Sequence, residues 1–280
     1  VGGVGLARAP LLPATRSPVI RSCLRQPPGE DAATEGVLSV NGALDASLPY
    51  RVLAFYALAP VVDPDACADL HRDFLQKEAM VGRVYVCADG LNAQVSGTPA
   101  SCEAYRRFAA SQFAGLRLIF KEDAIDELAF PRLRVKHKAL VPPPANGEAI
   151  DLKNRGEDLS PERWAAMLAD DSAPKVVLDV RNSYEWDVGR FAGAKRPELD
   201  HFAEFEPETF GLPAAAEARA ETPVMMYCTG GIRCEYFSAR LRQQGFKNVY
   251  KLEGGVQHYG NVMAEAEAEE AAAADGAHEA

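Results

Sequence analysis

The sequence lacks the residue pairs from which metal sites and disulfide frameworks are built. Its six cysteines include no C-x-x-C pair, and its five histidines are too far apart in sequence to form a paired metal motif. A chain of 280 residues is also too long to need a disulfide framework. We therefore expect no zinc or iron site and a reducing compartment. No apolar run reaches the length that spans a bilayer, so we expect no membrane partner.

Each end of the chain lacks charge of one sign. Residues 1–29 contain no Asp or Glu but four arginines, and residues 261–280 contain no Lys or Arg and are mostly Ala and Glu. Neither end has apolar periodicity, so we expect disorder over residues 1–47 and 261–280. The composition of the first segment is that of an organelle transit peptide or of an arbitrary low-complexity extension. A transit peptide predicts an organelle, a plastid rather than a mitochondrion; without one, the location is cytoplasmic.

Residues 48–141 alternate strand and helix signals. Tyr50–Leu58 is an apolar, β-rich run, and Asp63 with the proline after it is an N-cap and first-turn signal for a helix. Asp89-Gly90 between two short β-rich runs indicates a hairpin. A second helix is expected over Ala100–Phe113, and a last strand follows. The order β-α-β-β-α-β predicts a ferredoxin-like α/β sandwich.

One segment of this unit is basic although the whole chain has a net charge of −10. Between Leu128 and Gly147 there is no acidic residue, and basic residues alternate with other residues at a period of two. A strand here places on one face Arg132, Arg134, Lys136 and Lys138. This basic stripe predicts contacts with the phosphates of RNA. The alternative is a solvated edge strand whose charges prevent aggregation.

A second unit follows a proline-rich linker over residues 142–158. A helix signal at Ser160-Pro161-Glu162 opens it, and short continuous apolar strands then alternate with helices over residues 159–260. Such strands are typical of a parallel sheet covered on both faces. We expect a doubly wound parallel-sheet domain, which makes the whole chain α/β.

A strand of the second unit runs directly into a loop with the residues of a reactive thiol. The loop consists of Cys228, Thr229, Gly230, Gly231, Ile232, Arg233 and Cys234. Parallel sheets bind ligands at the carboxyl ends of their strands, where Cys228 lies. The two glycines let backbone N–H groups converge on one point, and the following helix adds its positive end. A thiolate there has a depressed pKa and is a nucleophile, and Arg233 supplies positive charge for the substrate.

Each loop cysteine has a second interpretation. Cys228 can be a buried thiol packed as a small hydrophobe, which the adjacent glycines and arginine disfavour. Cys234 can resolve a sulfenic acid or persulfide on Cys228, or it can be a core residue of the helix. The sequence leaves the role of Cys234 open.

Motifs in both units resemble those of known families. The second unit resembles a rhodanese domain in Leu178–Asn182, Gly189–Ala194, Cys228–Arg233 and Leu252–Gly255. Four further motifs restrict the resemblance to one family within the rhodanese superfamily: Gly82–Tyr85, Asp89–Gln94, Leu133–Val141 and Cys228–Glu235. Together they resemble the tRNA uridine hydroxylase family, whose members join an acylphosphatase-like domain of ferredoxin-like fold to a rhodanese domain. The resemblance covers about residues 50–260.

The resemblance implies an oxidoreductase that forms 5-hydroxyuridine at the wobble position of tRNA, with dioxygen as co-substrate and no recognised redox cofactor. Cys228 matches the essential loop cysteine. Asp179 and Arg181 match the first rhodanese motif and are expected to form a buried ion pair or to brace the loop. Asn92 and Gln94 match the first-domain motif, with no role assigned.

Two features depart from the family pattern. Arg190 stands where rhodanese domains usually have His. After about Tyr259 the chain becomes rich in Ala and Glu, whereas family members continue, many with a Cys-rich segment.

Three functions therefore compete. The leading hypothesis is a tRNA-modifying enzyme that acts through Cys228. The second is a rhodanese-type sulfurtransferase, in which Cys228 carries a persulfide from a small sulfur donor to a thiol. The third is a non-catalytic module that binds RNA or protein, which has no need of a thiol in the loop. The basic stripe favours the first over the second, because a small-molecule sulfurtransferase has no use for it.

Overall fold

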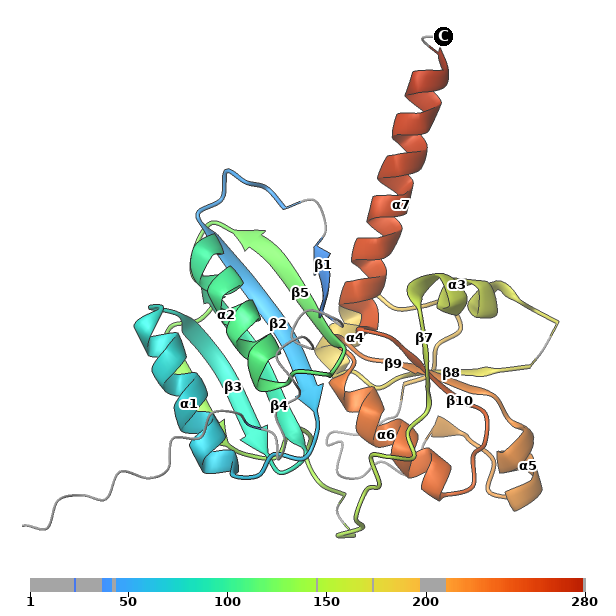
Figure 1. The fold of residues 1–280 in the computed structure, drawn as a ribbon. Coiled ribbons are helices and arrows are strands. Elements are labelled where there is room, and N and C mark those ends of the chain that lie inside the picture. Colours follow the sequence, from blue (N-terminus) through green and yellow to red (C-terminus); the bar gives the residue numbers. More distant parts are fainter. Residues whose placement is uncertain are drawn as a thin grey trace, which may run out of the picture.

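Two sheets, each with its own helices, make up the computed structural model of the protein (Figure 1). The structure describes residues 23, 37–41, 44–144, 146–172, 174–196 and 210–278. Within these ranges no helix combines the length and the apolarity that crossing a membrane requires.

The first sheet has six strands in the order β1-β5-β2-β4-β3-β6. They are β1 (Val37–Asn41), β2 (Tyr50–Leu58), β3 (Val81–Cys87), β4 (Gly90–Gly97), β5 (Leu118–Ile125) and β6 (Leu133–His137). Helices α1 (Pro64–Lys77) and α2 (Pro99–Gln112) begin after Asp63 and Thr98, whose side chains accept hydrogen bonds from backbone N–H groups of the first turn. The predicted ferredoxin-like order is confirmed, and β1 and β6 extend the sheet at its two edges.

Strand β2 shows how the first sheet separates its two faces. Leu53, Phe55 and Ala57 are buried in the core beneath α1 and α2. The alternating residues Ala54 and Tyr56 point to the opposite face, which no described helix of the first unit covers. This open face lies toward the second unit (Figure 1).

The second sheet is parallel throughout and has the order β7-β10-β9-β8. Its strands are β7 (Glu157–Leu159), β8 (Val176–Asp179), β9 (Val224–Tyr227) and β10 (Val249–Leu252). The helices are α3 (Pro161–Ala169), α4 (Ser183–Val188), α5 (Ala216–Glu221), α6 (Ile232–Gln243) and α7 (Gly255–His278). Phe237 of α6 packs in one core cluster, and Trp164 of α3 with Val256 of α7 in another. The predicted parallel sheet, covered on both faces, is confirmed.

Hydrogen bonds join the two units along the open face. The Tyr56 hydroxyl donates to Glu235 Oε1 at 2.7 Å, and Tyr236 donates to Asp89 Oδ2 at 3.3 Å. Arg117 pairs with Glu253 at the other end of the contact. The first turn of α6 is therefore held against the first unit.

Residues 1–47 and 261–280, which we expected to be disordered, contain a strand and part of a helix. Strand β1 lies within residues 1–47 and pairs in parallel with β5. Helix α7 continues to His278, so the prediction of a disordered tail over residues 261–280 is wrong for all but its last two residues, which lie outside the described residues. Ala and Glu have high helix propensity, so the composition that predicted disorder also favours a helix. The predicted transit peptide over residues 1–29 also lies, apart from Cys23, outside the described residues.

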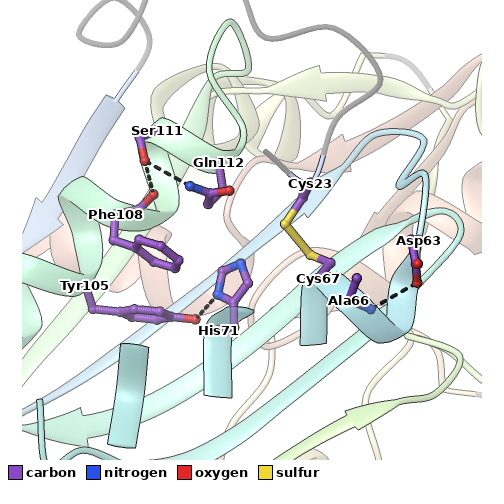
Figure 2. Close-up of a disulfide and its surroundings, with 9 residues drawn as sticks. All are labelled: Cys23, Asp63, Ala66, Cys67, His71, Tyr105, Phe108, Ser111 and Gln112. Atoms are coloured by element: carbon purple, nitrogen blue, oxygen red, sulfur yellow. Dashed lines mark hydrogen bonds between the residues drawn. A yellow bond between two sulfur atoms is a disulfide. The ribbon is translucent and has the colours of Figure 1, made fainter. Parts of the chain in front are cut away.

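Two of the six cysteines are joined by a disulfide that the spacing of the sequence did not indicate. Cys23 and Cys67 are bonded with their Cα atoms 5.4 Å apart, and both are buried (Figure 2). The pairing brings residue 23 onto α1 across 44 residues of sequence. It departs from the expectation of a reducing compartment, because disulfides persist under oxidising conditions. The other four cysteines have free thiols.

Candidate active site

Cys228 lies where the buried strand β9 ends and the loop to α6 begins. Its side chain is buried, and its Sγ accepts a hydrogen bond of 3.1 Å from the Gly231 N–H group. Gly231 caps α6 with a φ of +100°, and a Cβ there would lie 3.0 Å from the Tyr56 hydroxyl. A larger residue would therefore be strained and crowded at this position.

The surroundings of Cys228 favour its thiolate. Burial acts to raise its pKa, but hydrogen bonds from the Cys234 thiol and from the Cys234 and Arg233 amides, together with the charge of Arg233, outweigh it. The net effect lowers the pKa to about 6, so the thiol is ionised at neutral pH. Burial and the neighbouring Cys228 raise the pKa of Cys234 well above its ordinary value, so Cys234 stays protonated. Cys234 is both a core residue and the donor to the thiolate.

We predict that the hydrogen bond from the Cys234 thiol determines how far the pKa of Cys228 is lowered. Changing Cys234→Ala removes the hydrogen bond and is expected to raise the pKa of Cys228 by about one to two pH units, since a hydrogen bond to a charged group contributes about 1.5–3 kcal/mol. Cys234→Ser keeps a donor and should leave the pKa near the wild-type value. The rate of iodoacetamide alkylation against pH measures it. If Cys234→Ala and Cys234→Ser gave the same dependence of alkylation rate on pH, the Cys234 hydrogen bond would not control the pKa of Cys228.

Arg233 is held by a carboxylate. Its guanidinium lies 3.1 Å from Glu185 Oε2 and is half-buried, and the Thr229 hydroxyl donates to the same carboxylate. Glu185 also accepts from the Asn182 N–H group at 3.0 Å, so α4 braces the loop. The charge of Arg233 therefore serves this network and the Cys228 thiolate. Arg233 also lines the cavity described below, and its contact with the substrate stays a prediction.

Asp179 and Arg181 form an ion pair at the carboxyl end of β8. The Arg181 Nη2 and Nε atoms lie 2.7 and 3.1 Å from Asp179 Oδ2, and both side chains are buried. The Arg181 guanidinium also lies over the Tyr227 ring, with 5.3 Å between its carbon and the ring centroid. The ion pair therefore packs against Tyr227, the last residue of β9 before Cys228. Neither Asp179 nor Arg181 lines the cavity described next. Arg190, which stands where a histidine is usual, lies over the Trp186 ring at 4.7 Å.

A cavity of about 420 Å³ opens beside the Cys228 loop, and both units line it. The second unit contributes Tyr184 and Glu185 of α4, Gln257 of α7, and the loop residues Cys228, Thr229, Gly230, Ile232 and Arg233. The first unit contributes residues of its open face, among them Tyr56, Asn92, Gln94, Lys121 and Phe130. The structure thus brings Asn92 and Gln94, to which the sequence assigned no role, to the same cavity as Cys228.

Lys121 and Tyr56 are site residues that the sequence did not indicate. Lys121 is buried, and its ammonium group donates to the Gly230 carbonyl at 2.8 Å. Burial lowers the pKa of Lys121 to about 8, and the negative charge of Cys228 opposes this change. Burial and Glu235 raise the pKa of Tyr56 well above its ordinary value, so it stays neutral. Both reach the loop from the first unit, a contact that no local motif predicts.

The basic stripe lies on the same open face as the cavity. Val135 of β6 is buried in the helix-covered core, so the residues that alternate with it point to the opposite face. The four that do so are exposed: Arg132, Arg134, Lys136 and Lys138. Strand β6 is an edge strand, so these charges also fit the alternative of protection against pairing with another chain.

Strand register connects the stripe to the cavity. Residues in register on neighbouring strands point to the same face, which gives two rows across β6, β3 and β4: Arg134, Arg83 and Gln94, and Lys136, Tyr85 and Asn92. Each row spans two strand spacings, about 10 Å. The Arg83 guanidinium lies 5.9 Å from the ring of Phe130, which lines the cavity. Exposed cations thus extend from the edge of the sheet to the cavity.

In the part of the chain that the structure describes, one group of three side chains has metal-ligand geometry. It consists of Cys23, Cys67 and His71 and lies in the first unit, on the helix-covered side of its sheet. None of the three lines the cavity.

Known proteins resemble this chain over both units. Residues 50–141 match the UPF0176 acylphosphatase-like domain, and residues 160–261 match the rhodanese-like domain. A tRNA uridine(34) hydroxylase of Protochlamydia amoebophila is 40% identical over 212 residues, which cover 75% of this chain and 65% of that protein. One of Chlamydia trachomatis serovar D is 41% identical over 217 residues, which cover 76% and 64%. The chain therefore spans just under two thirds of the length of these bacterial relatives.

Proposed function

Because the chain belongs to the proteins that join a UPF0176 acylphosphatase-like domain to a rhodanese-like domain, we propose that it is an enzyme that hydroxylates uridine 34 of tRNA. Cys228 is its reactive thiol, and dioxygen is its co-substrate. The observation that carries the proposal is the cavity between the two units, in which the Cys228 loop faces a sheet surface with exposed cations.

The cavity has the size and lining for a nucleobase. Its volume of about 420 Å³ lies within the usual range of small-molecule sites. Uridine 34 is in a single-stranded loop, from which a base can be splayed out and stacked on aromatic rings. Tyr56, Phe130 and the exposed Tyr184 offer such rings, and the amides of Asn92 and Gln94 offer donors and acceptors for the edge of uracil.

The residues of this chain prepare the thiol and hold the substrate. The amides and the Cys234 thiol keep Cys228 anionic, which makes it a nucleophile beside the bound base. Lys121 fixes the Gly230 carbonyl and places a positive charge near the thiolate. The basic stripe meets the phosphates of the anticodon arm, and docking of the two units keeps water away from the loop.

Nucleoside mass spectrometry tests the proposal. Cells that lack the protein should lose 5-hydroxyuridine and its derivatives from tRNA, and re-expression should restore them. The purified chain should hydroxylate undermodified tRNA in air and not under argon. The Cys228 loop also fits persulfide transfer, so thiocyanate formation from thiosulfate and cyanide is measured in parallel. Sulfur transfer without tRNA hydroxylation would assign the chain to the sulfurtransferases instead.

The location of the protein stays a prediction. The predicted transit peptide lies, apart from Cys23, outside the described residues, and the relatives reported above are bacterial, so they lend no support to a plastid.

A further inference from the structure

Cys23, Cys67 and His71 form a compact group of metal-ligating side chains in the first unit. The two sulfur atoms and a ring nitrogen of His71 all lie within 4.8 Å of one another, and all three residues are buried. Cys67 and His71 are four residues apart on α1 and therefore share one face of the helix. Cys23 is placed beside them, and its carbonyl accepts a hydrogen bond of 3.3 Å from the Val62 N–H group.

His71 has the hydrogen-bond arrangement of a metal ligand. Its Nδ1 lies 2.9 Å from the Tyr105 hydroxyl, whereas its Nε2 is buried and has no hydrogen-bond partner among the residues that the structure describes (Figure 2). A buried nitrogen without a partner costs free energy and calls for an explanation. Metal-bound histidines usually donate their other ring N–H group to a neighbouring oxygen, which fixes the tautomer. A donor bond from Nδ1 to Tyr105 leaves the lone pair on Nε2, on the atom that lacks a partner.

We propose that Cys23, Cys67 and His71 bind one thiophilic divalent cation of the Zn²⁺ type when the disulfide is reduced. Two thiolates and one neutral imidazole suit such an ion, with a water molecule as the fourth ligand. Two negative thiolates and a divalent cation sum to zero charge, which a buried site requires, because a net charge there is costly. A monovalent ion would leave one negative charge uncompensated.

The disulfide and the metal site exclude each other. A dithiol reductant transfers two electrons and two protons to the disulfide, gives two cysteine thiols and becomes a disulfide itself. The cation then binds both sulfurs and releases their two protons. In either state residue 23 is fastened to α1: by a covalent bond under oxidising conditions and by a metal under reducing ones. The site is separate from the Cys228 cavity, so the inference does not depend on the proposed function.

Cobalt spectroscopy of the full chain tests the site. Metal-free protein is reduced with a phosphine, which takes oxygen from water as the disulfide becomes two thiols, and is then titrated with Co²⁺. We expect one Co²⁺ per chain, a sulfur-to-cobalt charge-transfer band in the near ultraviolet, and bleaching of the band by Zn²⁺. Protein oxidised with diamide should bind none. A reduced protein without the band would overturn the proposal.

Variants locate the ion. Cys67→Ser should remove the charge-transfer band, while Cys102→Ser, at another buried thiol of the same unit, and Cys228→Ser should keep it. Tyr105→Phe removes only the hydroxyl beside His71 and should weaken Co²⁺ binding by about 10–100-fold. X-ray absorption of the wild-type Zn²⁺ protein should give two sulfur ligands and one nitrogen ligand, which guards against misfolding of Cys67→Ser. A band that persists in Cys67→Ser, or absorption without sulfur ligands, would refute the site.

Discussion

Changing Cys228→Ser is expected to abolish the formation of 5-hydroxyuridine in tRNA while the protein stays folded. The serine hydroxyl is protonated at neutral pH, whereas the Cys228 thiol has a pKa lowered to about 6 and is ionised. Loss of a nucleophile lowers enzymatic rates by several orders of magnitude, so we expect a decrease of at least about a thousand-fold. The rate is measured with purified protein and undermodified tRNA, and the products are quantified by mass spectrometry.

The control for this variant is a second buried thiol. Cys102 is also fully buried and free, but it lies in the core of the first unit, where burial raises its pKa to about 12. Cys102→Ser should therefore keep the hydroxylase rate, and the melting temperatures of both variants show whether either has lost stability. Normal hydroxylation by Cys228→Ser would exclude thiol chemistry. A loss in both variants alike would point to folding rather than to catalysis.

Local patterns in the sequence predicted most of the fold. Capping residues and alternating apolar runs located the helices and strands of both units, because these signals act within a few residues. The strand–loop–helix pattern likewise located Cys228 at the end of β9 and the beginning of α6 at Ile232. Composition led to the wrong prediction for residues 261–278, which form part of helix α7 and not a disordered tail. Ala and Glu are common both in disordered segments and in helices, so their abundance does not distinguish the two.

The rest of the site depends on how the two units dock. Tyr56 reaches Glu235 and Lys121 reaches Gly230 across more than a hundred residues of sequence, so no spacing rule identifies them. The same holds for Cys23 and Cys67, which are 44 residues apart and meet only when α1 forms. The sequence also did not indicate the ion pair between Arg233 and Glu185, because Glu185 belongs to another element.

Reversing two charges of the basic stripe is expected to weaken tRNA binding strongly. Arg134 and Lys136 are exposed and stand at the start of the two rows that lead to the cavity. If each contacts a phosphate, Arg134→Glu with Lys136→Glu removes two contacts. The slope of log affinity against log salt concentration should then fall by about 1.4 to 1.8, since each contact contributes about 0.7 to 0.9. Binding isotherms at several salt concentrations measure both effects.

A matched variant separates local contacts from net charge. Lys153→Glu with Lys247→Glu makes the same change in charge at two exposed lysines, one in the linker before the rhodanese-like unit and one within that unit. Neither lines the cavity. This variant should keep most of the affinity and the wild-type salt slope. Both variants should keep the alkylation profile of Cys228, because none of the exchanged residues lines the cavity beside it. An unchanged slope for the stripe variant would make β6 a protected edge strand and remove the feature of this surface that favours RNA over a small sulfur donor.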